Sequence, residues 1–343
     1  MTPAKSLIHD FHAALETATP DTVSDVLVRF VTPDHHWRGM HPFHEQKGAK
    51  DVAATFWSPL LGAFTRVQRR EDIFFAGQNE IDGFTSTWVI SMGHLMGLHD
   101  RPFVGIPPTG KIAMLRYAEF NRVVDGKIVE TALFCDLLHL MRQAGCYPLP
   151  PQTAAHLVQP GPLTHDGLQF HDAPKPEGDK TLALINRMVG SIARNSNTGP
   201  GSQPAETPQE ELAQDWHDDM IWWGPTGIGA TYTIERYAKQ HSGPFRAAFY
   251  DRSGTGHVAR LAEGQFGGFF GWPNFTAKQR GGFMGMPEST KDCEFRVIDI
   301  YRRDGDKLAE NWIFIDMLYW LMQQGDDVLA RMAGIAGTQY RAP

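Results

Sequence analysis

Hydrophobic and polar positions follow first a helical period and then a strand period, and they do so twice along the chain. The amphipathic pattern predicts three helices in each half, at residues 6–15, after 20–22 and near 50–61 in the first half and at 180–193, after 208–210 and near 233–241 in the second. In each half the pattern then becomes an alternation, which is typical of β-strands.

The alternation is clearest from residue 112 onward, where two strands are joined by a short turn. Asp125-Gly126 is a favourable hairpin turn, and Gly305-Asp306 takes its place in the second half. Each half also has an aromatic pair before its short helix, which we interpret as a turn: His36-Trp37 and Trp222-Trp223. Helices first and antiparallel strands afterwards predict an α+β fold in each half.

The two halves are copies of one another. Residues 117–145 align without a gap on residues 297–325, at a constant offset of 180, with eight identical positions of 29. In this alignment Glu119 faces Asp299, a conservative pair. Farther upstream, Phe56 matches Tyr237 at an offset of 181. We therefore expect a duplicated domain, since a solenoid would show more than two repeats.

The length of 343 residues exceeds what one compact core usually holds. The repeat predicts a first domain at residues 1–146 and a second at 177–343. Between them, residues 147–176 are rich in proline and polar residues and are typical of a linker. A second loose stretch, at residues 195–207, separates two helices of the second copy.

Composition excludes several classes of protein. With 32 basic and 39 acidic residues the chain is net acidic, which argues against binding to nucleic acid or to an anionic membrane. No apolar stretch reaches the roughly 18–20 residues that span a bilayer, and the first residues lack a signal-peptide pattern. The three cysteines are too few and too scattered for a disulfide framework. A cytoplasmic protein is expected.

The order of elements, the segment GIPPTGK at residues 105–111 and the ending at residues 125–145 resemble the SnoaL-like polyketide cyclases of the nuclear-transport-factor-2-like superfamily. The resemblance covers residues 6–146 and 180–332. It implies two tandem cone-shaped domains, each a curved antiparallel sheet wrapped on N-terminal helices around an apolar pocket. It also implies enzymes that need neither metal nor organic cofactor.

In the cyclases, an acidic residue at the end of the last strand shuttles a proton, and the resemblance assigns that role to Asp136, with Asp316 as its counterpart. Each aspartate interrupts an apolar run, so burial is expected to raise its pKa toward the range of a general acid or base. An N-cap is the alternative interpretation, because a helix is expected to start just after each residue.

Histidines supply the second candidate chemistry. His94 follows Gly93, where a missing side chain leaves room for a ligand, and its imidazole could polarise a carbonyl; the alternative is a hydrogen-bonded core histidine. The second copy has Trp272 nearby instead, so the first half is favoured as the competent one. His36 or His41 is a further candidate for contacting the carbonyl.

Residues 34–45 hold four histidines and two acids, but their spacing fits no familiar zinc site. A pocket mouth is the preferred interpretation, and a solvated loop the alternative. Aromatic side chains are expected to form an apolar wall, although most such rings are core residues. The predicted ligand-contacting residues are Trp37, Arg38, His41, Trp88, Phe103, Glu119, Trp223 and Trp312.

These observations predict a cofactor-independent acid–base enzyme, a lyase or isomerase acting on a small carbonyl or polyketide-like compound. Aldol or retro-aldol reaction, isomerisation and dehydration all begin with removal of an activated proton, and the sequence does not separate them. A non-catalytic small-molecule-binding protein is the alternative. A third interpretation is an assembly module in which the two domains pair within one chain, with a homodimer also open.

Overall fold

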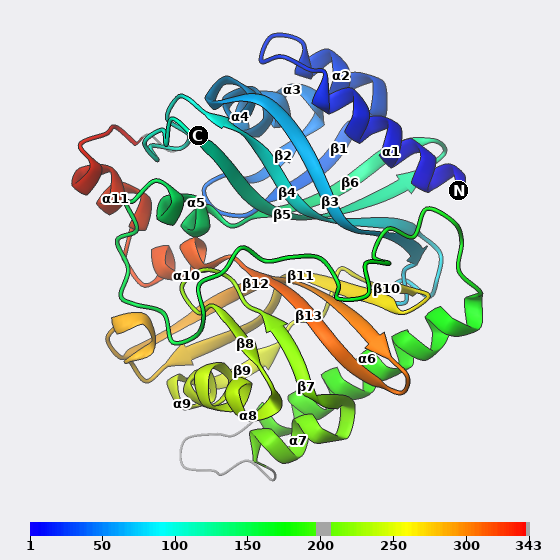
Figure 1. Ribbon diagram of the computed structural model, residues 1–343, viewed down its shortest axis with the longest axis vertical. Helices are drawn as coiled ribbons and strands as arrows, with labels where there is room; N and C mark the ends of the chain where they lie inside the picture. The colour runs from blue at the N-terminus through cyan, green and yellow to red at the C-terminus, as the bar shows by residue number, and fades with distance from the viewer. Residues whose placement is uncertain (197–206, 341–343) are drawn as a thin grey trace. The chain divides into compact units, whose positions relative to one another are not determined.

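The computed structural model describes residues 1–196 and 207–340, which form two compact units (Figure 1). The first unit comprises Met1–Pro148, Pro160–Asp172 and Asp327–Pro343, and the second comprises Leu149–Gln159 and Ala173–Asp326. Most of the loose stretch expected at residues 195–207 lies outside the described residues. Among the described helices, none is long and apolar enough to cross a membrane.

The first unit is a six-stranded sheet with its early helices on one face (Figure 1). In spatial order the strands are β2 (His44–Lys47), β1 (Val31–Gly39), β6 (Lys127–Cys135), β5 (Ile112–Val124), β4 (Thr87–His99) and β3 (Phe64–Gln78). The helices are α1 (Pro3–Glu16), α2 (Val23–Phe30), α3 (Gly48–Val52), a π-helix (Ala53–Trp57), α4 (Ser58–Ala63), α5 (Leu137–Gln143) and α11 (Val328–Ala336).

The second unit repeats this order of elements. Its sheet runs β10 (Ala259–Glu263), β11 (Phe266–Gln279), β12 (Ser289–Asp304), β13 (Lys307–Ile315), β7 (Trp216–Trp223) and β8 (Ala230–Tyr232), and β9 (Phe249–Gly254) also pairs with β11. Its helices are α6 (Lys175–Ser196), α7 (Pro208–Asp215), α8 (Ile234–Tyr237), a π-helix (Ala238–Ser242), α9 (Gly243–Ala248), a short 3₁₀-helix (Phe283–Gly285) and α10 (Met317–Gln323).

The α+β class and the two-domain layout predicted from the sequence are confirmed. Each sheet departs from the antiparallel expectation at one place, because β1 runs parallel to β6 and β7 runs parallel to β13. These partners are the first and last long strands of each copy. Hairpin patterning reveals only neighbours along the chain, so it gives no information about this pairing.

The structure corrects the upstream part of the repeat alignment. Phe56 and His241 each occupy the fourth position of a π-helix, which sets the offset there at 185. The same offset brings Trp37 beside Phe56, with ring centroids 5.7 Å apart, and Trp222 beside His241 at 4.1 Å. The sequence match of Phe56 with Tyr237 is therefore wrong by one helical turn.

The aromatic pairs predicted to form turns lie instead within strands β1 and β7. Trp37 pairs across the sheet with Gln46 on one side and Thr131 on the other. Gly39 and Gly224 follow two residues after the buried tryptophans, and a Cβ atom at either position would overlap the tryptophan ring. A glycine after an aromatic residue here marks close packing of a ring rather than a turn.

Both predicted hairpin turns are confirmed. Asp125 and Gly126 join β5 to β6 with φ angles of 48° and 71°, the left-handed pair that a tight two-residue hairpin requires. Gly305 and Asp306 join β12 to β13, with a φ of 60° at Gly305.

Candidate functional site

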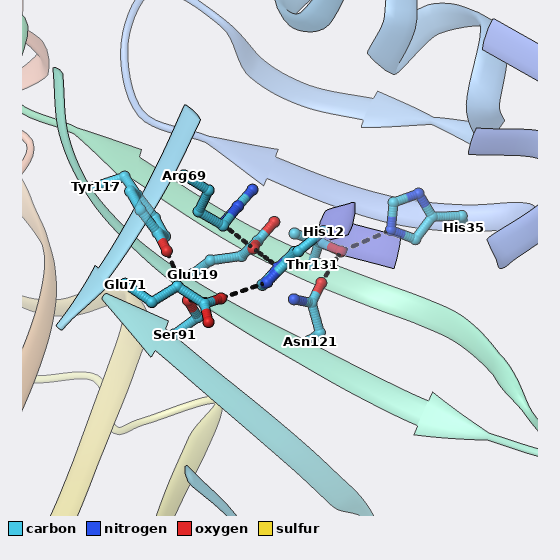
Figure 2. Close-up of polar contacts among 9 residues, drawn as sticks. All are labelled: His12, His35, Arg69, Glu71, Ser91, Tyr117, Glu119, Asn121 and Thr131. Carbon is cyan, nitrogen blue, oxygen red and sulfur yellow. Dashed lines mark hydrogen bonds and ion pairs between the residues drawn. The ribbon is translucent and has the colours of Figure 1, made fainter. Parts of the chain in front are cut away.

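A charged cluster lies buried in the first unit between α1 and the sheet. The imidazole of His12, from α1, sits between two carboxylates: Nδ1 is 2.7 Å from Oε1 of Glu71 and Nε2 is 2.8 Å from Oε2 of Glu119 (Figure 2). Arg69 donates from Nη1 to the same Oε2 at 3.0 Å. Glu119 is only 1% exposed, so these contacts replace its hydration.

The strands around this cluster supply further partners. The Arg69 guanidinium lies 4.5 Å from the centroid of the Tyr117 ring, and the Tyr117 hydroxyl is 2.7 Å from Oγ of Ser91. Ser91 in turn donates to Glu71 at 3.3 Å. The charged cluster, defined as His12, Arg69, Glu71, Ser91, Tyr117 and Glu119, thus links α1 with β3, β4 and β5.

Electrostatics fix the ionisation of this cluster. Burial alone would raise the pKa of Glu119, but the Arg69 charge and the hydrogen bond from His12 outweigh it and lower that pKa to about 2. The pKa of Glu71 is also lowered, because the hydrogen bond from His12 outweighs burial. A carboxylate that stays ionised in this way is a weak base, so the cluster is better suited to holding α1 on the sheet than to moving protons.

The second unit encloses a cavity of about 270 Å³ between its helices and its sheet. Its walls are mainly apolar, with Leu212, Trp216, Trp222, Phe245, Phe269 and Phe275 among them. Its polar side chains include Asp299 and Asn311 from the sheet, Tyr237 and His241 from the helices, and Arg252 from β9. An apolar cavity with a few convergent polar groups is typical of a small-molecule site.

Asp299 occupies the β12 position that Glu119 occupies on β5, yet its ionisation is opposite. Burial raises the pKa of Asp299 to about 7, and hydrogen bonds from Asn311 and Tyr301 oppose that rise only in part. Nδ2 of Asn311 donates to Oδ1 of Asp299 at 3.1 Å. At neutral pH this carboxyl is present in both forms, which is what a general acid–base residue requires.

The cavity side chains His241 and Arg252 also have pKa values shifted by burial. His241 lies flat on Trp222, and burial together with the charge of Arg252 lowers its pKa to about 3, so the imidazole is neutral at pH 7. Burial and repulsion by Arg246 lower the pKa of Arg252 to about 10, so this guanidinium remains charged.

The two aspartates assigned to proton transfer by the family resemblance are helix N-caps. Asp136 accepts from the backbone N–H of His139 at 2.9 Å, at the start of α5. Asp316 accepts from the backbone N–H of Tyr319 at 3.2 Å, at the start of α10. The geometry therefore matches the alternative that the sequence offered for both residues.

This geometry predicts the effect of replacing Asp316. Asp316→Ala is expected to lower the free energy of unfolding by about 1 kcal/mol, whereas Asp316→Asn, which keeps a capping oxygen, is expected to cost much less. Urea unfolding of both variants checks this. An Asn variant as unstable as the Ala variant would show that the negative charge, rather than the cap, is what Asp316 contributes.

His94 lies on the other face of its sheet from the charged cluster. On β4 it is three residues from Ser91, and the register pairs Ser91 with Glu119 but His94 with Arg116. Nδ1 of His94 is 3.4 Å from Oδ2 of Asp72. Asp136 and Asp72 both act electrostatically on the buried Arg116. The structure therefore brings the predicted pair His94 and Asp136 near one buried arginine.

The predicted residues of the pocket mouth lie on the hairpin of β1 and β2 and in contact with its neighbour β6. His36 is 2.7 Å from the Glu45 carboxylate, and His41 is 3.2 Å from His44. Arg38 forms an ion pair with Glu130 at 2.9 Å. The structure therefore places His36 and His41 in local contacts of the hairpin.

The predicted aromatic wall residues are buried in the cores of the two units. Those concerned are Trp37, Trp88, Phe103, Trp223 and Trp312. The Trp88 indole donates to Ser86, and Phe103 packs against the ring of Phe43. In the second unit, Trp222 lines the cavity, whereas the neighbouring Trp223 and Trp312 do not.

Sequence reasoning did not single out the polar side chains of the cavity. Asp299 was visible only as the partner of Glu119, although its carboxylate interrupts the apolar run from Val297 to Tyr301. Tyr237, His241 and Arg252 carried no signal, because the repeat alignment was displaced around them. Within the described ranges, no group of three or more His, Cys, Asp or Glu side chains is arranged to hold a metal ion.

A model of the SnoaL-like polyketide cyclase family matches residues 9–144 and 273–325, together more than half of the chain. No curated protein sequence is significantly similar.

Solved structures similar to this chain each cover about one half of it. A putative SnoaL-like polyketide cyclase from Jannaschia sp. is 21% identical and covers 44% of this chain and 98% of its own, with a TM-score of 0.34. An NTF2-like protein from Burkholderia thailandensis is 21% identical and covers 42% of this chain and 98% of its own, with a TM-score of 0.31. A steroid delta-isomerase from Pseudomonas aeruginosa is 16% identical and covers 46% of this chain and 95% of its own, with a TM-score of 0.28.

Proposed function

Because this chain belongs to the SnoaL-like polyketide cyclase family, we propose that it is a cofactor-independent acid–base enzyme whose proton-transfer site is the cavity of the second unit. The observation that carries the proposal is Asp299. It is a buried carboxyl facing an apolar cavity, and its pKa of about 7 lets it accept and return a proton at neutral pH.

In the proposed reaction, the ionised Asp299 removes a proton from a carbon next to a carbonyl group. The electron pair of the broken C–H bond forms a C=C bond, and the carbonyl oxygen becomes an enolate oxygen. The site itself favours this proton transfer, because protonation of the buried carboxylate removes the free-energy cost of keeping a charge out of water. Aldol closure, retro-aldol cleavage, isomerisation and dehydration share this first step.

The cavity sets the size of the substrate. An engineered protein cavity of about 150 Å³ holds one benzene ring. The present volume of about 270 Å³ suits a carbonyl compound of one or two rings, or an extended chain of similar size. The aromatic walls formed by Trp222, Phe245 and Phe275 favour a flat ligand.

The proposal places the chemistry in the second unit, although the sequence favoured the first because of His94. The difference lies in the equivalent carboxyl groups. Glu119 has a pKa of about 2 and is hydrogen-bonded by His12 and Arg69, so it has little capacity to accept a proton at pH 7. Asp299 has the basicity that the reaction needs.

A non-catalytic ligand-binding protein is the second candidate function. The stacking of His241 on Trp222 supports it, because together these rings offer a flat surface for an aromatic ligand whether or not a proton moves.

Hydrogen–deuterium exchange at carbon separates the two candidates. Wild-type protein in D₂O is offered β-keto esters, hydroxy-ketones and cyclic ketones, and loss of the α-proton signal is followed by NMR. Asp299→Asn is expected to abolish the exchange, whereas Asp136→Asn and Asp316→Asn are expected to retain it. Exchange that disappears with Asp136→Asn but survives Asp299→Asn would overturn the assignment.

The pH dependence of this exchange gives a further prediction. The rate constant kcat/KM is expected to rise with pH with a midpoint near 7, since the base must be ionised. Tyr301→Phe removes a hydrogen bond that lowers the pKa of Asp299, so the midpoint is expected to move upward by about 0.5–1 pH unit. Profiles from pH 5 to 9 test this against Tyr232→Phe, an exposed tyrosine. A midpoint that stays in place or falls contradicts the prediction.

A further inference from the structure

The hydroxyl of Tyr237 is a polar group of the cavity wall. Tyr237 ends α8 and lines the cavity, and no described residue forms a hydrogen bond with its hydroxyl. Its ring is held edge-on by Trp222 and by His241, with both centroids 5.4 Å away and both interplanar angles at 65°. The ring is therefore held in place, and its hydroxyl is available for a hydrogen bond to a ligand in the cavity.

The surroundings of this hydroxyl are strongly charged. Burial, and next the charge of Asp299, raise the pKa of the Tyr237 phenol well above its usual value, so it stays protonated and can donate a hydrogen bond. Arg246, Glu211 and Arg252 also act on it electrostatically. The phenol thus lines the same cavity as the proposed base Asp299.

The two nearby arginines are held differently. Nη2 of Arg246 is 2.6 Å from Oε2 of Glu211, so its charge is balanced by an ion pair. Arg252 lies over aromatic rings, 5.3 Å from the centroid of Phe245 and 4.6 Å from that of Phe275. All five side chains line the cavity, and Arg252 brings a positive charge to its aromatic wall.

We propose that Tyr237 is a catalytic residue that donates a hydrogen bond to the carbonyl oxygen of the ligand, and that the charge of Arg252 stabilises the enolate formed there. The inference rests on the proposed function and names its reacting group, a ketone or aldehyde oxygen.

The step balances in protons and electrons. Asp299 gains the proton from carbon, the C–H electron pair becomes the new C=C bond, and the carbonyl electron pair moves onto oxygen. Tyr237 keeps its proton and shares it with that oxygen through a hydrogen bond that strengthens as negative charge develops. Return of the proton from Asp299 to a carbon atom of the enolate restores the site.

The first unit has no equivalent hydroxyl. At the offset of 185 that relates the helices of the two copies, Tyr237 corresponds to Val52 in α3. The proposed oxyanion site is therefore specific to the second unit, which agrees with the different ionisation of Asp299 and Glu119.

A phenolate tests the proposal without any need to know the substrate, because its oxygen resembles that of an enolate. Binding of 4-nitrophenolate to the full chain is followed by its absorbance and by quenching of tryptophan fluorescence. Tyr237→Phe is expected to weaken this binding at least tenfold and to leave binding of uncharged 4-nitrotoluene unchanged. Asp299→Asn is expected to strengthen it, because a nearby negative charge is removed. Tyr232→Phe serves as the matched control, since Tyr232 is exposed and lies outside the cavity.

Kinetics give a second readout that a purely structural role would not move. In the α-proton exchange, Tyr237→Phe is expected to lower kcat at least a hundredfold with little change in KM, because the hydrogen bond is strongest after charge has moved to oxygen. Failure of 4-nitrophenolate to bind, or equal affinity in wild type and Tyr237→Phe, would overturn the inference. Tyr237-dependent phenolate binding without exchange of any compound would instead overturn the proposed function and leave Tyr237 as a ligand-binding residue.

Discussion

Asp299→Asn is expected to abolish proton transfer and, at the same time, to make the folded protein more stable above pH 7. Removal of this carboxyl from the cavity is expected to lower kcat for α-proton exchange by about a hundredfold to ten-thousandfold, since general acid–base catalysis contributes about 10²–10⁴. The gain in stability follows from the same burial that raises the pKa of Asp299.

The sign follows from proton linkage. The pKa of Asp299 is about 7 in the folded chain and 3.8 in an unfolded one, so the folded state retains a proton that the unfolded state loses between these values. Wild-type stability therefore falls as pH rises from about 4 to 7, by up to about 4 kcal/mol. Below pH 4 both states are protonated and the variant gains little. Above pH 7 the gain is largest.

Urea unfolding at pH 4.5 and at pH 8.5 measures the effect, with tryptophan fluorescence as the signal. Asp218→Asn, at an exposed position on β7, is the matched control and is expected to show no comparable pH dependence. An Asp299→Asn protein that is less stable than wild type at pH 8.5 would contradict the assignment of a buried base with a raised pKa.

The contrast between Asp299 and Glu119 shows where sequence reasoning stopped. The alignment correctly placed both acids at one position of the last long hairpin, because identities there are dense and the offset is constant. Their chemistry depends on partners far away along the chain. His12 is 107 residues from Glu119 and Arg69 is 50 residues from it, and neither proximity follows from local pattern.

The α+β duplication was predictable because periodicity and turn chemistry are local properties. The cavity was not, because it depends on which side chains of α7, α9 and β9 reach the space above β12. The face of His94 illustrates an intermediate case. Because side chains alternate between the two faces of a strand, His94 is expected on the opposite face from Ser91. Only the observed register shows that Ser91 shares its face with Glu119. The N-caps at Asp136 and Asp316 were foreseen as an alternative, and geometry favours them.

Arg69→Met is expected to produce the largest loss of stability in the first unit, about 3–5 kcal/mol, because it leaves buried negative charge without its main counter-charge. Arg69 is the largest favourable influence on the ionised form of Glu119, and its side chain is only 3% exposed. Without it, His12 alone faces the carboxylates of Glu71 and Glu119.

The pH dependence identifies the cause. The folded pKa of Glu119 is about 2 and its ordinary value is 4.5, so its contribution to stability is complete above pH 4.5 and is lost as pH falls toward 2. Arg69→Met is expected to raise that pKa, and the difference between variant and wild type therefore shrinks in acid. Backbone hydrogen exchange in β3 and β5, measured at pH 7 and at pH 4, reports the opening of this region.

The double variant Arg69→Met/Glu119→Leu separates charge from packing. Replacing both members of a buried pair by apolar side chains is often neutral, so the double variant is expected to recover much of the stability that Arg69→Met loses. A double variant as unstable as the single one would show that Arg69 acts through its packing on Tyr117 instead of its charge. Since the proposed base lies in the second unit, both folded variants are expected to retain α-proton exchange. Loss of exchange in a folded Arg69→Met protein would place the chemistry in the first unit after all.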